Sequence, residues 1–215
     1  MDDRLLAMCE LSNDLLFQKI PRQRLAWYVD RSLRAGREAA GLFAGCSIQE
    51  LYRQHGVAIR YSGSGKHSYG VILRGQSVMG PDGCSVEIYR DSIQELAAHS
   101  AWNGTALTDG QALDVHLAHE FFHIWEYLEG RSIAGELEPV TTLEFLGFRR
   151  TAHIGRCCEI AAHAFARELL ALPFLPNFYD YLYLIDTGQM SREAFQALTD
   201  RMGTLLNYTE QDKGE

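Results

Sequence analysis

The chain is organised around residues 108–130, which read TDGQALDVHLAHEFFHIWEYLEG. Thr108 followed three residues later by Gln111 is a capping-box pattern, which predicts the start of a helix. Apolar residues then recur at helical spacing, and Gly130 is a residue type that commonly ends a helix. The segment therefore predicts one long helix, and the other elements of the chain are placed around it.

Inside this helix, residues 119–123 form the pattern HExxH. Residues four apart on a helix of about 3.6 residues per turn lie one above the other, so the imidazoles of His119 and His123 can reach one metal ion. Glu120 flanks them and is placed to act as a general base in hydrolysis. The motif thus predicts a metal site with Glu120 as its catalytic residue.

A catalytic zinc site takes a third protein ligand and leaves a fourth position for water. The metzincin continuation of the motif would require Gly at position 126 and His at position 129, whereas the chain has Glu126 and Glu129, which we expect on a solvated face. The other common solution takes a Glu from a later helix. Glu159 opens such a helix in the segment 159–173, EIAAHAFARELLALP. We therefore expect Glu159 to complete the site.

The combination of HExxH with E-x-x-A-x-x-F-A-x-x-L-L resembles the ImmA/IrrE metallopeptidases, gluzincins that cleave helix-turn-helix repressors in bacteria and their mobile elements. The positions that carry the second motif are Glu159, Ala162, Phe165, Ala166, Leu169 and Leu170. The resemblance covers about residues 57–173 and leaves 1–45 and 177–215 unmatched. It implies a Zn²⁺ ion held by His119, His123 and Glu159 in a minimal gluzincin-like fold.

The chain departs from the family pattern at three positions. Phe122 stands where a small residue often precedes the second His, and Pro173 follows Leu170 by three residues instead of two. His163 stands where the family usually has Asn. A polar side chain there can orient a ligand by hydrogen bond from the second shell, and a histidine can also compete for the metal.

The resemblance implies metal-assisted hydrolysis of a peptide bond. Zinc would lower the pKa of a water molecule to about 7 and polarise the carbonyl, while Glu120 takes the proton. The candidates for stabilising the oxyanion are Tyr179, Tyr181, Tyr183 and His153. Substrate is expected as a strand added to a sheet edge, for which residues 85–89 are the candidate.

The expected substrate is a specific protein, a helix-turn-helix transcriptional repressor or an antitoxin-like regulator. The alternative is a non-catalytic, metal-stabilised module that binds such a regulator without cutting it. Glu120 favours catalysis, because a site that only holds zinc has no need of a base.

The remaining segments predict an α+β fold. The expected elements are two helices in residues 3–44 broken at Pro21, a helix opened by Ser47 and Glu50, strands at 57–61, 69–73 and 85–89 in a small sheet built largely of hairpins, helices starting at Ser92 and Thr141, a helix from about 151 to 172, and one or two helices in 177–206. We expect a helical N-terminal extension (1–45), a metallopeptidase domain (46–176) and a C-terminal helical segment packed on that domain (177–215).

Composition limits the partners. Among 215 residues there are 20 Lys and Arg against 28 Asp and Glu, a net charge of -8, and no basic run, so we expect no direct nucleic-acid binding. No apolar stretch approaches the ~20 residues that span a bilayer, so we expect no membrane partner. Five cysteines, two of them adjacent, predict reduced thiols and a cytoplasmic location.

Overall fold

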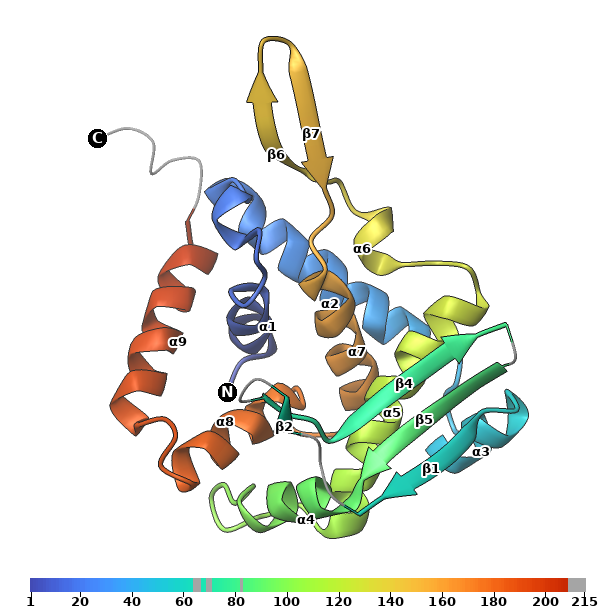
Figure 1. Cartoon of the computed structure of the whole chain (residues 1–215). Coiled ribbons are helices and arrows are strands. Elements are labelled where there is room, and N and C mark those ends of the chain that lie inside the picture. Colours follow the sequence, from blue (N-terminus) through green and yellow to red (C-terminus); the bar gives the residue numbers. More distant parts are fainter. Residues whose placement is uncertain (64–66, 69–70, 82, 209–215) are drawn as a thin grey trace.

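The computed structural model describes residues 1–63, 67–68, 71–81 and 83–208 and has the predicted α+β fold (Figure 1). The helices are α1 (Asp3–Leu11), α2 (Leu25–Gly41), α3 (Ile48–Gln54), α4 (Arg90–Ala98), α5 (Asp109–Leu128), α6 (Ile133–Glu136), α7 (Arg156–Leu169), α8 (Asn177–Asp186) and α9 (Arg192–Leu206), with the 3-10 helices η1 (Phe17–Lys19) and η2 (Arg22–Arg24). The strands are β1 (Ala58–Ser62), β2 (His67–Ser68), β3 (Val71–Ile72), β4 (Gly75–Gly80), β5 (Gly83–Tyr89), β6 (Val140–Phe145) and β7 (Phe148–Ala152).

The main sheet has three strands in the order β1-β5-β4. β4 and β5 form an antiparallel hairpin, in agreement with a sheet built largely of hairpins, although β4 was not among the expected strands. β1 runs parallel to β5, so the sheet is mixed. The chain returns from β1 to β5 by way of β4, which leaves β5 in the centre. Val86 and Ile88 of β5 are fully buried, on the side where α5 covers the sheet.

This topology corrects the predicted substrate edge. Residues 85–89 belong to the central strand β5, whose backbone groups are already hydrogen-bonded to β1 on one side and β4 on the other. They therefore cannot accept a further strand. The edge strand that packs against α5 is β4, which the sequence analysis missed. The predicted strand 69–73 falls partly on residues 69 and 70, which lie outside the described residues, while Val71–Ile72 pair with β2 in a separate small sheet.

Three predicted helix starts are wrong. Thr141 and Glu144 have the spacing of a capping box but lie in β6 of a two-stranded hairpin, and α7 begins at Arg156 instead of near residue 151. Ser92 lies inside α4, which starts at Arg90. By contrast, the capping boxes that open α3 and α5 are both formed as predicted.

The N-terminal helices form part of the core. α2 packs along α7, and the two backbones meet at Gly36, where an added Cβ atom would lie 2.1 Å from the carbonyl oxygen of Ala161. Only glycine permits this approach. α1 lies beside α9, and the buried Asn177 at the start of α8 donates a hydrogen bond to the Leu6 carbonyl at 3.0 Å. None of the helices described has the length and apolar character of a membrane span.

Candidate metal centre

His119, His123 and Glu159 converge between α5 and α7 and could hold a metal ion. The Nε2 atom of His119 lies 3.2 Å from Nε2 of His123 and 3.2 Å from Oε2 of Glu159. The remaining pair, His123 Nε2 and Glu159 Oε1, is 3.7 Å apart. They are the only such group of His, Cys, Asp and Glu found among the described residues.

These spacings fit the donor set of a zinc ion. Donors about 2.0–2.2 Å from one tetrahedral ion lie about 3.3–3.6 Å from each other. Burial alone would lower the pKa of His123, but the carboxylates of Glu126 and Glu159 outweigh it and raise that pKa to about 10. Burial would likewise raise the pKa of Glu159, yet His119 and His123 hold it far below its usual range. A metal ion bound by these residues would have to displace the proton that His123 holds in the metal-free site.

The N-terminal segment holds the helix that carries Glu159. α7 begins after Gly155, which has no side chain to cap it. Asp14, which is distant in sequence, caps the helix instead: its carboxylate accepts a hydrogen bond from the backbone N–H of Arg156 at 3.0 Å. The Arg156 guanidinium in turn pairs with the buried Glu10 at 2.8 Å. The position of Glu159 therefore depends on residues at the opposite end of the sequence.

Glu126 corrects another expectation. The sequence analysis placed it on a solvated face with Glu129, but only Glu129 is exposed, whereas Glu126 is 5% exposed. Its Oε1 accepts a hydrogen bond from the backbone N–H of Ile133 at 2.6 Å. Its Oε2 lies 3.6 Å from Nδ1 of His123, the ring nitrogen that faces away from the ligand cluster. Carboxylates in this position orient metal-binding histidines.

Glu120 faces the edge strand β4. The hydroxyl of Ser77 donates a hydrogen bond to Oε2 of Glu120 at 2.7 Å. Gly75 lies beside the same glutamate: a Cβ atom there would be tight against Cδ1 of Ile88 at 3.2 Å and in near-ordinary contact with Cγ of Glu120 at 3.4 Å. Sequence reasoning missed both residues, since the strand that carries them has no apolar alternation.

His163 lies against the metal ligands without joining them. Its ring centroid is 4.6 Å from that of His119, its Nδ1 atom is buried without a hydrogen-bond partner, and burial keeps its pKa well below the usual value. It is not one of the converging ligands. The Nδ1–H of His116 donates a hydrogen bond to the Ala112 carbonyl oxygen, 2.9 Å away, and burial lowers the pKa of His116 to about 4. Both are neutral rings that pack beside the site.

A cleft of about 550 Å³ opens over the ligands, between β4 and the segment after α5. The three candidate tyrosines of α8 do not line it, since Tyr179, Tyr181 and Tyr183 are buried in helix packing. His153 lines a neighbouring groove that also reaches Glu159, and its Nδ1 lies 2.9 Å from the Ala134 carbonyl. A polar residue not singled out in the sequence, Tyr127, does line the cleft.

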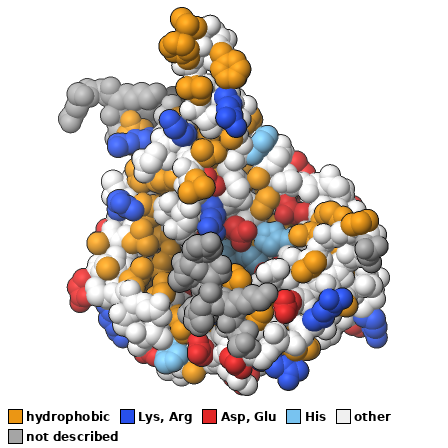
Figure 2. Space-filling view, viewed as in Figure 1, with side chains coloured by type: hydrophobic (Ala, Val, Ile, Leu, Met, Phe, Trp, Pro, Cys, Tyr) orange, Lys and Arg blue, Asp and Glu red, His pale blue; other side chains and the backbone are white. Residues whose placement is uncertain are grey.

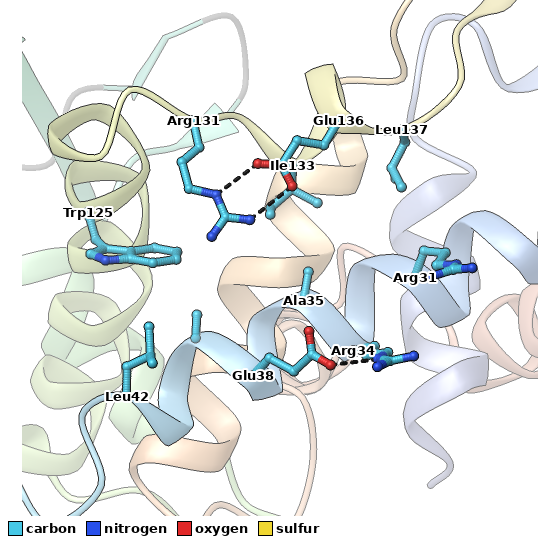
Figure 3. Close-up of a pocket in the computed structure, with 11 residues that line it drawn as sticks. Arg31, Arg34, Ala35, Glu38, Leu42, Trp125, Arg131, Ile133, Glu136 and Leu137 are labelled. Atoms are coloured by element: carbon cyan, nitrogen blue, oxygen red, sulfur yellow. Dashed lines mark hydrogen bonds and ion pairs between the residues drawn. The ribbon is translucent and has the colours of Figure 1, made fainter.

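A separate pocket of about 410 Å³ lies between α2 and the segment after α5 (Figure 3). It contains three arginines, of which Arg34 is paired with Glu38 and Arg131 with Glu136. Its charges are thus largely satisfied within the protein, and none of its residues is a metal ligand. Among the described residues, the candidate metal ligands and the candidate base therefore lie together at the cleft between α5, α7 and β4.

Comparison with known proteins returned no matching family model, no matching curated protein and no matching solved structure. Function is therefore inferred from the residues of the site itself.

Proposed function

We propose that the protein is a zinc-dependent endopeptidase that hydrolyses a peptide bond in a specific protein. The observation that carries this proposal is the meeting of His119, His123 and Glu159 beside the carboxylate of Glu120. A site that only holds a metal ion does not need a further carboxylate beside the ligands that is not itself a ligand and lines an open cleft.

In this proposal, His119, His123 and Glu159 would hold Zn²⁺ beside the cleft that they line. When bound, the zinc ion supplies a Lewis acid that makes water a nucleophile at neutral pH and polarises the scissile carbonyl. Glu120 takes the proton from the attacking water and delivers it to the leaving amine. Ser77 fixes the rotamer of Glu120 through its hydrogen bond. Glu126 holds the imidazole of His123 in its ligating orientation.

The free edge of β4 is the proposed support for the substrate backbone. Among the described residues, β4 pairs only with β5 in the main sheet, and it borders the cleft with Gly75, Gln76, Ser77 and Met79. An extended peptide added there would pass alongside Glu120. This arrangement favours an endopeptidase acting on an extended segment of a protein.

The substrate class that we propose follows the resemblance of the two motifs, namely a helix-turn-helix repressor or an antitoxin-like regulator. We place the reaction in the cytoplasm, because all five cysteines are free thiols, as expected under reducing conditions. The acidic net charge agrees with a protein partner in preference to nucleic acid.

The test is to compare the wild type with Glu120→Gln and the matched control Glu129→Gln, which changes an exposed glutamate at the end of the same helix. New protein N-termini would be labelled in cells producing each form, and zinc would be measured on the purified proteins. We expect about one zinc per chain in all three, and new N-termini with the wild type and the control only. Equal processing by Glu120→Gln would refute the peptidase and leave a metal-stabilised binding module.

A further inference from the structure

The hairpin β6–β7 projects from the body of the molecule (Figure 1), and Figure 2 shows apolar side chains gathered at its far end. Four large apolar residues there are mostly exposed, namely Leu143, Phe145, Leu146 and Phe148. We call these four residues the hairpin patch. Single exposed apolar residues are common, but a cluster on a projecting element marks an interaction surface.

Leu146 is unfavourable at its position in two independent ways. It forms the turn of the hairpin with Gly147, and both have positive φ, +47° and +82°. Such two-residue turns prefer Asn, Asp or Gly, because a larger L-residue is strained in the left-handed region. The same side chain is also 90% exposed. A leucine that is costly both to the backbone and in water points to a partner that covers it.

The distribution of side chains on the hairpin favours a protein partner. Phe145 pairs with Phe148 across the two strands, and the next pair inward is Glu144 with Arg149. Successive pairs point to opposite faces of a hairpin, so Phe145, Phe148 and Leu143 lie on one face, with Arg150 opposite Leu143, while Glu144 and Arg149 lie on the other face. Insertion into a bilayer would bury the charged pair as well, whereas docking on a protein covers one face only.

A groove leads from the candidate metal centre to the base of the hairpin. It measures about 680 Å³ and runs from Glu159 past Gly155 to His153, at the base of β7. Its opposite wall includes Leu15, whose side chain is fully exposed. β6 itself lies beside η1, just after this wall. A polypeptide leaving the metal centre along this groove therefore arrives at the hairpin.

We propose that the hairpin patch is an exosite, a binding surface away from the reacting bond, for an apolar segment of the same protein substrate that is cut at the metal centre. This inference rests on the proposed function and specifies the substrate further. The substrate combines an extended segment over β4 with an apolar segment that covers Leu146, and the chain between them occupies the groove beside Leu15. A short peptide around the scissile bond lacks the second segment.

The first experiment uses the full chain and the protein whose cleavage depends on Glu120. Its cleavage rate is compared for the wild type, Leu146→Asn and the control Leu42→Asn, which changes an exposed leucine directly after α2. We expect at least a tenfold slower rate for Leu146→Asn and a change below twofold for Leu42→Asn. Asn is better suited to the turn, so the melting temperature of Leu146→Asn should not fall. Cleavage by Leu146→Asn at the wild-type rate would overturn the exosite while leaving the peptidase intact.

The second experiment places a photoreactive benzophenone side chain at position 146 or at position 79, in the cleft, of the Glu120→Gln protein in its native cells. We expect both positions to cross-link the same protein. If that protein is not cut by the wild type, the peptidase proposal fails but the hairpin patch remains the docking surface of a binding module. Cross-links from position 146 to lipid, to a second copy of this chain, or to a protein not captured from position 79 would overturn the inference.

Discussion

Replacing Glu126 by Gln tests whether a buried carboxylate of α5 sets the affinity for the metal. Glu126 Oε2 lies 3.6 Å from Nδ1 of His123, and its other oxygen accepts the Ile133 N–H at 2.6 Å. Removal of such an outer partner typically weakens metal binding 10- to 100-fold. We therefore expect zinc affinity to fall by about 10- to 100-fold in Glu126→Gln, which corresponds to roughly 1.4–2.7 kcal/mol.

The two oxygens of Glu126 make separable contributions. Gln retains an oxygen that can accept the hydrogen bond from Ile133, so the metal-free Glu126→Gln protein should keep most of its stability. Ala removes this acceptor as well and leaves a buried N–H unsatisfied, which costs about a further 1–3 kcal/mol of unfolding free energy. The pair of variants therefore separates the effect on the metal from the effect on folding.

The assay is a competition titration of zinc against a chromophoric chelator, with thermal unfolding of the metal-free proteins measured in parallel. Glu129→Gln is the control, because Glu129 is exposed and belongs to the same helix end. If Glu126→Gln binds zinc within twofold of the wild type, the contact with His123 has no influence on the metal. Its burial would then be explained by the hydrogen bond to Ile133 alone.

Three further predictions concern Glu159, Gly75 and Gly36. Glu159→Ala should reduce the zinc content of purified protein from about one per chain to a small fraction, and a chelator that lowers the melting temperature of the wild type should leave this variant unchanged; equal zinc in both would exclude Glu159 as a ligand. Gly75→Ala should press mainly on Cδ1 of Ile88, 3.2 Å from the added Cβ atom, and only lightly on Glu120 at 3.4 Å, so we expect a stability cost of about 1 kcal/mol, the low end for overpacking, and a loss of cleavage below tenfold; complete loss of cleavage with zinc retained would show that β4 constrains the base more tightly than these distances indicate. Gly36→Ala should destabilise the fold by about 3 kcal/mol or more, because its Cβ atom overlaps Ala161, and a melting temperature within 2 °C or so of the wild type would contradict the close helix contact.

Two of the three residues of the candidate metal site were predictable because their signals are local. HExxH places two ligands one helical turn apart, so a correct helix prediction for α5 already brings their side chains together. The third ligand depends on packing between α5 and α7, and only the motif around Glu159 selected it in advance. The burial of Glu126 also had a local signal, since it lies three residues after His123 on the same side of the helix. Its partner Ile133, however, becomes apparent only when the chain turns back after α5.

The sequence predictions were wrong in segments whose conformation is determined by pairing with another strand and not by the local sequence pattern. β4 has Gly at both ends, with two polar and two apolar residues between them that do not alternate, and it is a strand because its backbone pairs with β5 beside Glu120. In β6, Thr141 and Glu144 imitate a helix start, but cross-strand pairing with β7 determines the conformation. The parallel pairing of β1 with β5 depends on contacts distant in sequence, which no short pattern encodes.

The contact of the N-terminal helices with α7 bears on how this protein can change over generations. Asp14 caps the helix that carries Glu159, Glu10 holds the arginine beside that cap, and Gly36 leaves no room for a side chain between α2 and α7. A gene rearrangement that exchanged the first 45 codons would therefore also alter the third ligand of the metal centre. The beginning of the chain and the helix of Glu159 must be inherited together, and variation acceptable in one is limited by the sequence of the other.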